Sequence, residues 1–157
     1  MIDIISLLKT DQENIKRFKK GLLSSEEFNR KQEETSLAFF EYFQMNGFPC
    51  KKNNRNEIYK AGVTLSLHQP LERQKIILEN VKDGCMEKSD QAFLVDKIRV
   101  QEGEEQEYGT QYKVQKGTII FLPIKDKERV DEKREEVGLE SLAEYKETAE
   151  ANLRRLG

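Results

Sequence analysis

Residues 110–122 read Thr-Gln-Tyr-Lys-Val-Gln-Lys-Gly-Thr-Ile-Ile-Phe-Leu and decide the fold class, because they interrupt a chain otherwise patterned as helix. Two runs rich in β-branched and aromatic residues flank Gln115-Lys116-Gly117, an arrangement typical of a hairpin. Pro123 then ends the second run. We therefore predict a mainly α protein with one β-hairpin inserted near residues 110–122.

The rest of the chain has apolar residues at helical spacing. The spacing predicts helices over about 3–21, 24–46, 57–67, 71–82 and 89–101 before the hairpin, and over 127–137 and 142–155 after it. Ser24 with Glu27, and Ser141 with Glu144, form capping boxes at two helix starts. With no repeat and no long linker, we expect a single domain, 1–157, of six to seven helices.

Composition restricts the class of protein. A length of 157 residues is enough for a core without disulfides or metals. Charged residues make up 36%, yet 27 basic and 29 acidic residues leave a net charge of −2, which argues against a nucleic-acid or anionic-membrane binder. No apolar run approaches the ~20 residues of a membrane span, and no signal-peptide pattern opens the sequence. We expect a soluble, cytoplasmic protein.

Metal and cofactor sites find little support in the sequence. Cys50, Cys85 and His68 are the only cysteines and histidine, fewer than the about four ligands of a structural zinc site. In the expected reducing compartment both cysteines are predicted to be free thiols, although a Cys–His nucleophile pair stays open. No nucleotide-binding loop is present, so no cofactor is predicted. The acidic run 102–107 is interpreted as a solvated loop, with a metal site as the alternative.

Four polar residues fall within apolar helix faces. Asp11, His68, Gln74 and Asp96 each share a helical stripe with aliphatic neighbours. Burying such a group without a partner costs about 1–3 kcal/mol, so each needs one. We predict that Asp11, His68 and Asp96 converge in space. The charged run 126–134, in contrast, is interpreted as a solvated helix face.

A polar pocket around His68 is the functional interpretation of this pattern. His68 would donate or accept a proton, and Asp96 or Asp11 would orient it, since a carboxylate beside a histidine fixes its tautomer and stabilises the imidazolium ion. Gln74 would open into the same space. The structural alternative is a satisfied buried network, or a histidine placed favourably at a helix end.

The segment before the first strand is the second candidate. Tyr108 and Gln111, around Gly109, carry hydroxyl and amide groups that suit recognition of a polar ligand. Tyrosine and threonine are also ordinary strand residues, so simple entry into the hairpin is the alternative.

The chain resembles an uncharacterised bacterial family, catalogued as domain of unknown function "six six two four". The residues that carry the resemblance, in chain order, are Asp11-Gln12, Gly47-Phe48-Pro49, His68, Asp96-Lys97-Ile98, Gln106-x-Tyr108-Gly109-Thr110-Gln111, Pro123-Ile124, Val130-Asp131-x-x-Arg134-x-x-Val137-Gly138-Leu139 and Leu142-Ala143-Glu144-Tyr145. Family members usually have Gln before the histidine and Arg after the aspartate, where this chain has Leu67 and Lys97. His68, Asp96, Tyr108 and Gln111 match the family pattern directly. The resemblance supports one site for the four polar residues on apolar faces, Asp11, His68, Gln74 and Asp96, and it names no reaction.

Two functions follow from these observations. The first is a polar pocket that binds or slowly transforms a small polar ligand, with His68 as acid or base and Asp96 as its orienting carboxylate. Tyr108 and Gln111 would recognise the ligand, and Asp11 and Gln74 would support the site. The alternative is an immunity or regulatory protein that binds a protein partner without catalysis. A concave pocket around His68 favours the first, and a flat charged patch the second.

Overall fold

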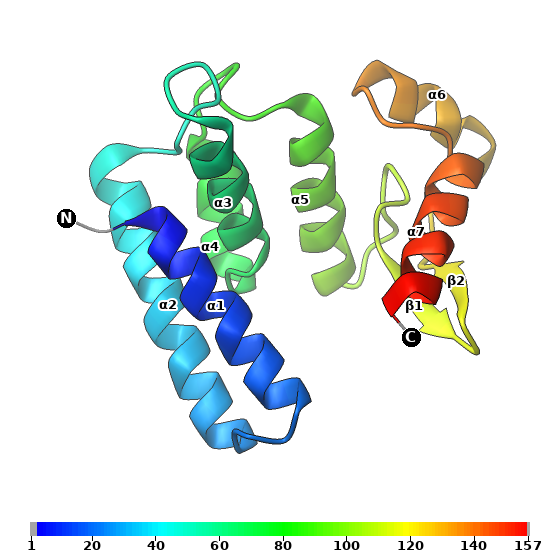
Figure 1. The fold of residues 1–157 in the computed structure, drawn as a ribbon. Helices are drawn as coiled ribbons and strands as arrows, with labels where there is room; N and C mark the ends of the chain where they lie inside the picture. The colour runs from blue at the N-terminus through cyan, green and yellow to red at the C-terminus, as the bar shows by residue number, and fades with distance from the viewer. Residues whose placement is uncertain (1–2, 157) are drawn as a thin grey trace. The chain divides into compact units, whose positions relative to one another are not determined.

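The computed structural model describes residues 3–156 and confirms the predicted fold class. Within these residues the chain forms seven α-helices and one two-stranded antiparallel hairpin (Figure 1). The chain divides into two compact units, Met1–Met86 and Glu87–Gly157. The single domain over 1–157 stays a prediction, and each unit is described by itself below.

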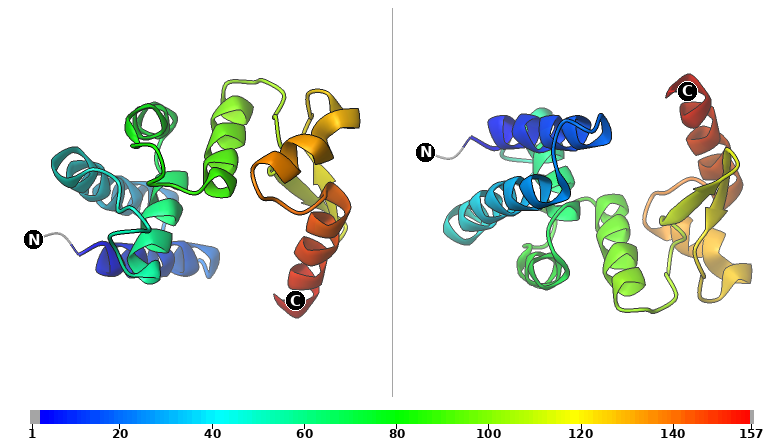
Figure 2. Two further views of the ribbon diagram at one scale, coloured as in Figure 1. Left: turned by 90° about the horizontal axis from the view of Figure 1, so that it is seen from above. Right: turned by 90° about the horizontal axis from the view of Figure 1, so that it is seen from below.

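The first unit consists of four helices. They are α1 (Ile4–Lys19), α2 (Ser25–Asn46), α3 (Asn56–Leu67) and α4 (Leu71–Asn80). The predicted capping box is present, since the Ser24 hydroxyl accepts the Glu27 N–H and the Glu27 carboxylate accepts the Ser24 N–H. α1 packs against both α2 and α3, and Figure 2 shows α1 and α2, in blue and cyan, side by side. The core centres on fully buried side chains of α2, α3 and α4, namely Phe39, Tyr59, Leu65 and Ile77.

The two cysteines form a disulfide, so the prediction of free thiols is wrong. Cys50 lies in the loop between α2 and α3, and Cys85 follows α4. The two loops run close together, with the Lys51 N–H donating to the Cys85 carbonyl at 3.4 Å. A separation of 35 residues gives no sign of this approach, because it depends on how the helices between the cysteines pack.

The second unit combines three helices with the hairpin. It contains α5 (Lys88–Gln101), β1 (Tyr112–Gln115), β2 (Thr118–Phe121), a short 3-10 turn (Lys127–Arg129), α6 (Val130–Glu136) and α7 (Leu142–Leu156). Tyr112 pairs with Phe121 and Val114 with Ile119 across the hairpin. α7 packs against β2, and the side chain of Ile119 is buried.

Two elements begin later than the sequence predicts. Thr110 and Gln111 lie outside β1, because their N–H groups bond the side chains of Asp96 and Gln106 instead of a neighbouring strand. The predicted helix 127–137 is split into a 3-10 turn and α6, and it follows Asp126, whose φ of +50° is left-handed. Among the helices of residues 3–156, none combines the length and the apolar character of a membrane span.

Candidate functional site

A histidine–carboxylate pair joins α1 to the end of α3. Nδ1 of His68 lies 2.7 Å from Oδ2 of Asp11, across 57 residues of sequence. The Asp11 side chain is 3% exposed, whereas the His68 side chain is 32% exposed. The pair therefore has a buried carboxylate behind an imidazole that reaches solvent.

The position of His68 follows from the way α3 ends. His68 is the C-cap residue, and its backbone N–H donates to the Thr64 carbonyl at 3.1 Å. The Asp11 carboxylate can only accept a hydrogen bond, so the neutral imidazole carries its proton on Nδ1 and donates it to Asp11. The Nε2 lone pair is then free to accept a proton. Within residues 3–156, Nε2 has no protein hydrogen-bond partner. This arrangement can accept a proton at Nε2, and Asp11 then stabilises the imidazolium ion.

Gln74 supports the turn that carries His68. It is fully buried, and its amide nitrogen donates to the carbonyls of Leu67 and Gln69 at 3.0 and 2.7 Å. The Gln69 side chain in turn accepts a bond from Ser36 of α2 at 2.8 Å. These bonds fix the connection between α3 and α4, so Gln74 acts on the position of His68.

Asp96 lies in the second unit, where a loop wraps around its carboxylate. The side chain is 0% exposed. It accepts backbone N–H groups of Glu107, Tyr108 and Thr110 at 2.7 to 3.2 Å, and the Thr110 hydroxyl at 3.0 Å. The Asp96 carboxylate thus binds the loop before the hairpin.

Gln106 and Arg134 secure the other side of this loop. The buried Gln106 amide accepts the Gln111 N–H and donates to the Gln111 and Leu122 carbonyls, all at 2.8 to 2.9 Å. Arg134 is 0% exposed and donates to the carbonyls of Tyr108 and Glu140 at 2.6 and 2.5 Å. Its guanidinium also lies over the Tyr145 ring, 5.0 Å from the centroid. The prediction that residues 126–134 form a solvated helix face is wrong for Arg134, because this side chain is buried.

The predicted recognition residues have different surroundings. The Gln111 side-chain amide donates to the Thr110 hydroxyl at 3.0 Å. Burial, with the charges of Asp96 and Glu107, raises the pKa of the Tyr108 hydroxyl, which keeps it neutral. Beside it, the Lys133 ammonium lowers the pKa of Glu107 by a hydrogen bond of 2.9 Å. The six predicted residues thus fall into two groups: Asp11, His68 and Gln74 in one unit, and Asp96, Tyr108 and Gln111 in the other.

A family model for a "Family of unknown function (DUF6624)" matches residues 68–153, which is more than half of the chain. The chain belongs to this family. The DUF6624 match begins at His68 and contains Asp96, the Tyr108–Gln111 segment and Arg134, whereas Asp11 lies outside it. No curated protein and no solved structure matches the chain.

Gln106 and Arg134 lie in the DUF6624 region and are functional candidates that the apolar pattern of the sequence does not reveal. The sequence predicts no buried role for Gln106 or Arg134, because neither interrupts an apolar stripe. Backbone N–H and C=O groups that precede a strand and have no strand partner need hydrogen bonds from buried side chains. Such a segment is the signal that could indicate these residues. In the described part of the chain, no group of three or more His, Cys, Asp or Glu side chains is arranged to hold a metal ion.

Proposed function

We propose that this protein binds a small polar ligand at the exposed edge of His68 and transfers a proton to or from it. The observation that carries the proposal is the 2.7 Å contact between a buried Asp11 carboxylate and a half-exposed His68 imidazole. A carboxylate in this position orients an imidazole for acid–base work, and an open Nε2 is the atom that would meet the ligand.

Each residue has a defined task in this proposal. Nε2 of His68 takes a proton from a ligand hydroxyl or from a water molecule that attacks the ligand, and it returns the proton to the leaving group. Asp11 holds the ring and stabilises the charge formed on it. Gln74 positions the turn. Asp96 is assigned to the loop before the hairpin, and roles for Tyr108 and Gln111 in ligand recognition stay predictions.

A single histidine makes the proposal easy to test. The chain contains one histidine, so its ¹⁵N resonances report the tautomer of His68 without assignment of other rings. We expect the Nδ1–H form in the wild-type protein and a loss of this preference in Asp11→Asn. Activity is followed with p-nitrophenyl acetate, whose hydrolysis needs only an activated water or imidazole. His68→Gln and Asp11→Asn should both lose this activity.

The control is Glu79→Gln, which removes an exposed carboxylate of the same unit. It should hydrolyse the ester like the wild-type protein. Equal rates in wild type, His68→Gln and Glu79→Gln would contradict acid–base chemistry. The partner-binding alternative would then take its place.

The cellular compartment is part of the proposal. The Cys50–Cys85 disulfide supports an oxidising compartment over the predicted cytoplasmic one, since reducing compartments keep thiols free. Freshly lysed cells treated at once with an alkylating reagent test this point. Protection of both cysteines until a reductant is added supports the oxidising location, and immediate alkylation of both supports the cytoplasm.

A further inference from the structure

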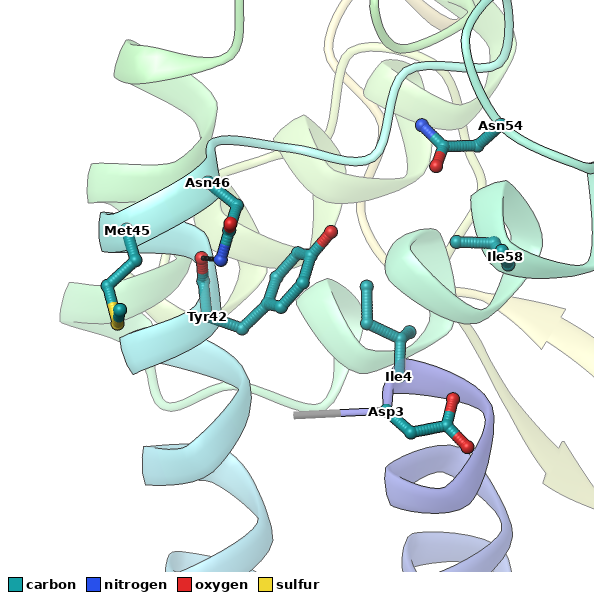
Figure 3. A pocket seen from close by; sticks show the side chains of 7 residues that line it. All are labelled: Asp3, Ile4, Tyr42, Met45, Asn46, Asn54 and Ile58. Atoms are coloured by element: carbon teal, nitrogen blue, oxygen red, sulfur yellow. Dashed lines mark hydrogen bonds between the residues drawn. The ribbon is translucent and has the colours of Figure 1, made fainter. Parts of the chain in front are cut away.

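A cavity of about 680 Å³ lies in the first unit, where the start of α1, the end of α2 and the start of α3 meet. Figure 3 shows the side chains around it. Sites for small molecules typically measure roughly 300–1,000 Å³, so this cavity is of suitable size. Neither Asp11 nor His68 is among its lining residues, and it is therefore separate from the proposed acid–base site.

The floor of the cavity is apolar. Ile4 is the first residue of α1 and is 4% exposed, and Ile58 extends toward it from α3 (Figure 3). The ring of Tyr42, from α2, forms the adjoining wall. Two aliphatic side chains and one ring face suit a flat hydrophobic group, because such a group loses the most water-exposed surface on contact.

Polar side chains complete the cavity, namely Asp3, Tyr42, Asn46 and Asn54. The Tyr42 hydroxyl points into the hollow, and residues 3–156 supply no hydrogen-bond partner for it (Figure 3). Asn54 lies opposite in the loop before α3. Its amide nitrogen donates to the Cys50 carbonyl at 3.0 Å, which leaves its Oδ1 as an acceptor. The cavity thus offers a hydroxyl and a carbonyl oxygen beside an apolar floor.

We infer that this cavity is a binding site for a small aromatic molecule that carries one hydroxyl or N–H group. The ring lies against Ile4 and Ile58, and the polar group bonds the Tyr42 hydroxyl and Asn54 Oδ1. A wholly apolar molecule would leave both polar atoms without a new bond, and an anion would meet the like charge of Asp3, which also lines the cavity.

The disulfide holds one wall of this site. Asn54 is bonded to the carbonyl of Cys50, and Cys50 is bonded covalently to Cys85. Reduction by dithiothreitol breaks the S–S bond, places two electrons and two protons on the cysteines, and converts the reagent to its cyclic disulfide. The loop that carries Asn54 then loses its covalent anchor, and the affinity for the aromatic molecule falls.

Benzyl alcohol and toluene, which differ by one hydroxyl group, are the probes. The side-chain methyl resonances of Ile4 and Ile58 are followed by NMR in the oxidised full-length protein. We expect saturable shifts with benzyl alcohol. Tyr42→Phe should weaken its binding by about threefold to tenfold, the value of one hydrogen bond, and leave toluene binding unchanged. Tyr112→Phe, in the other unit, is the matched control and should bind like the wild type.

The outcomes separate the parts of the inference. Absence of saturable shifts at Ile4 and Ile58 overturns the site, and equal benzyl alcohol affinity in wild type and Tyr42→Phe overturns the role of the hydroxyl. Weaker binding after reduction, and in the Cys50→Ser/Cys85→Ser double variant, supports the anchored wall. Unchanged affinity in that variant, with a wild-type amide spectrum outside residues 47–55 and 81–86, overturns it.

Discussion

Asp96 and Arg134 hold opposite polar edges of one loop. The Asp96 carboxylate accepts N–H groups of residues 107, 108 and 110, while the Arg134 guanidinium donates to the Tyr108 carbonyl at 2.6 Å. Both side chains are 0% exposed. The Asp96 charge is satisfied by backbone N–H groups of this segment, and Nη1 of Arg134 binds a carbonyl of the same segment, so the loop can remain buried without a strand partner. Nη2 of Arg134 is buried and has no hydrogen-bond partner within residues 3–156.

Asp96→Asn is expected to destabilise the second unit by about 2–4 kcal/mol, because an amide NH₂ would face backbone donors that need an acceptor. The amide protons of Glu107, Tyr108 and Thr110 should lose protection first. Hydrogen exchange followed by NMR measures this effect residue by residue. Glu147→Gln, an exposed carboxylate of α7, serves as the control. Wild-type protection at the three amides in Asp96→Asn would contradict the loop-holding role.

Gly109→Ala should cost far more than Gly117→Ala. Both glycines have positive φ, +67° and +77°, so both variants carry the backbone strain of about 1–2 kcal/mol. A Cβ at Gly109 would lie 2.8 Å from side-chain carbons of Ile124 and Leu142, whereas a Cβ at Gly117 meets nothing within 4 Å. Urea unfolding should therefore show that the free energy of unfolding falls by about 1–3 kcal/mol more, the cost of overpacking, in Gly109→Ala alone. Equal losses in the two variants would show that the surroundings of Gly109 can yield.

The helices could be predicted because their signals are local. The Ser24–Glu27 capping box and the helix from Leu71 are set by neighbouring residues, and the structure has both. The disulfide could not be predicted, since the approach of Cys50 to Cys85 depends on packing between distant segments. The same holds for Thr110, whose hydrogen bond goes to a side chain of another helix and not to a strand.

The candidate site was only partly within reach of sequence reasoning. Interrupted apolar stripes correctly indicated that Asp11 and Asp96 are buried polar groups with partners. Periodicity does not say which partner each one has, so the sequence leaves both Asp96 and Asp11 as the carboxylate that orients His68, and the structure has Asp11 in contact with it. The burial of Arg134 could not be predicted, because its sequence neighbours are polar. A basic residue among acidic neighbours has the pattern of a solvated surface. Its burial depends on carbonyl groups that the local pattern does not show, those of Tyr108 and Gly109 about 25 residues earlier and that of Glu140.

Tyr145 should make the free energy of unfolding depend on pH in the alkaline range. Burial raises the pKa of its hydroxyl to about 12, and the hydroxyl donates to the Thr110 carbonyl at 3.1 Å. The folded chain holds this proton more tightly than the unfolded chain. Its contribution to stability is therefore complete below pH 10.0 and declines as the pH rises toward about 12.

Ultraviolet titration of the tyrosines measures the ionisation of the Tyr145 hydroxyl. Tyr145→Phe should remove the ionisation at the highest pH and make the free energy of unfolding fall less steeply above pH 10.0. Tyr42→Phe, which changes a tyrosine of the other unit, should leave both features in place. An unaltered high-pH step in Tyr145→Phe would refute the assignment.

His68→Ala and His68→Gln together separate a structural role from a chemical one. Asp11 is 2% exposed, so His68→Ala leaves its carboxylate without the Nδ1–H donor and should cost about 1–3 kcal/mol in thermal unfolding. His68→Gln should cost less, because the glutamine amide can donate to the same oxygen. Neither variant can carry a proton near neutral pH, so both should lose hydrolysis of p-nitrophenyl acetate.

The glutamine variant decides between the two roles. If His68 serves only to satisfy Asp11, His68→Gln restores stability and retains full activity, which would contradict the proposed proton transfer. If His68 is the acid–base group, His68→Gln is folded and inactive, since its amide makes the bond to Asp11 but accepts no proton. Retained ester binding with lost turnover in this variant would assign His68 to the chemical step, since recognition of the ester would then survive without the imidazole. We expect a folded, inactive His68→Gln protein.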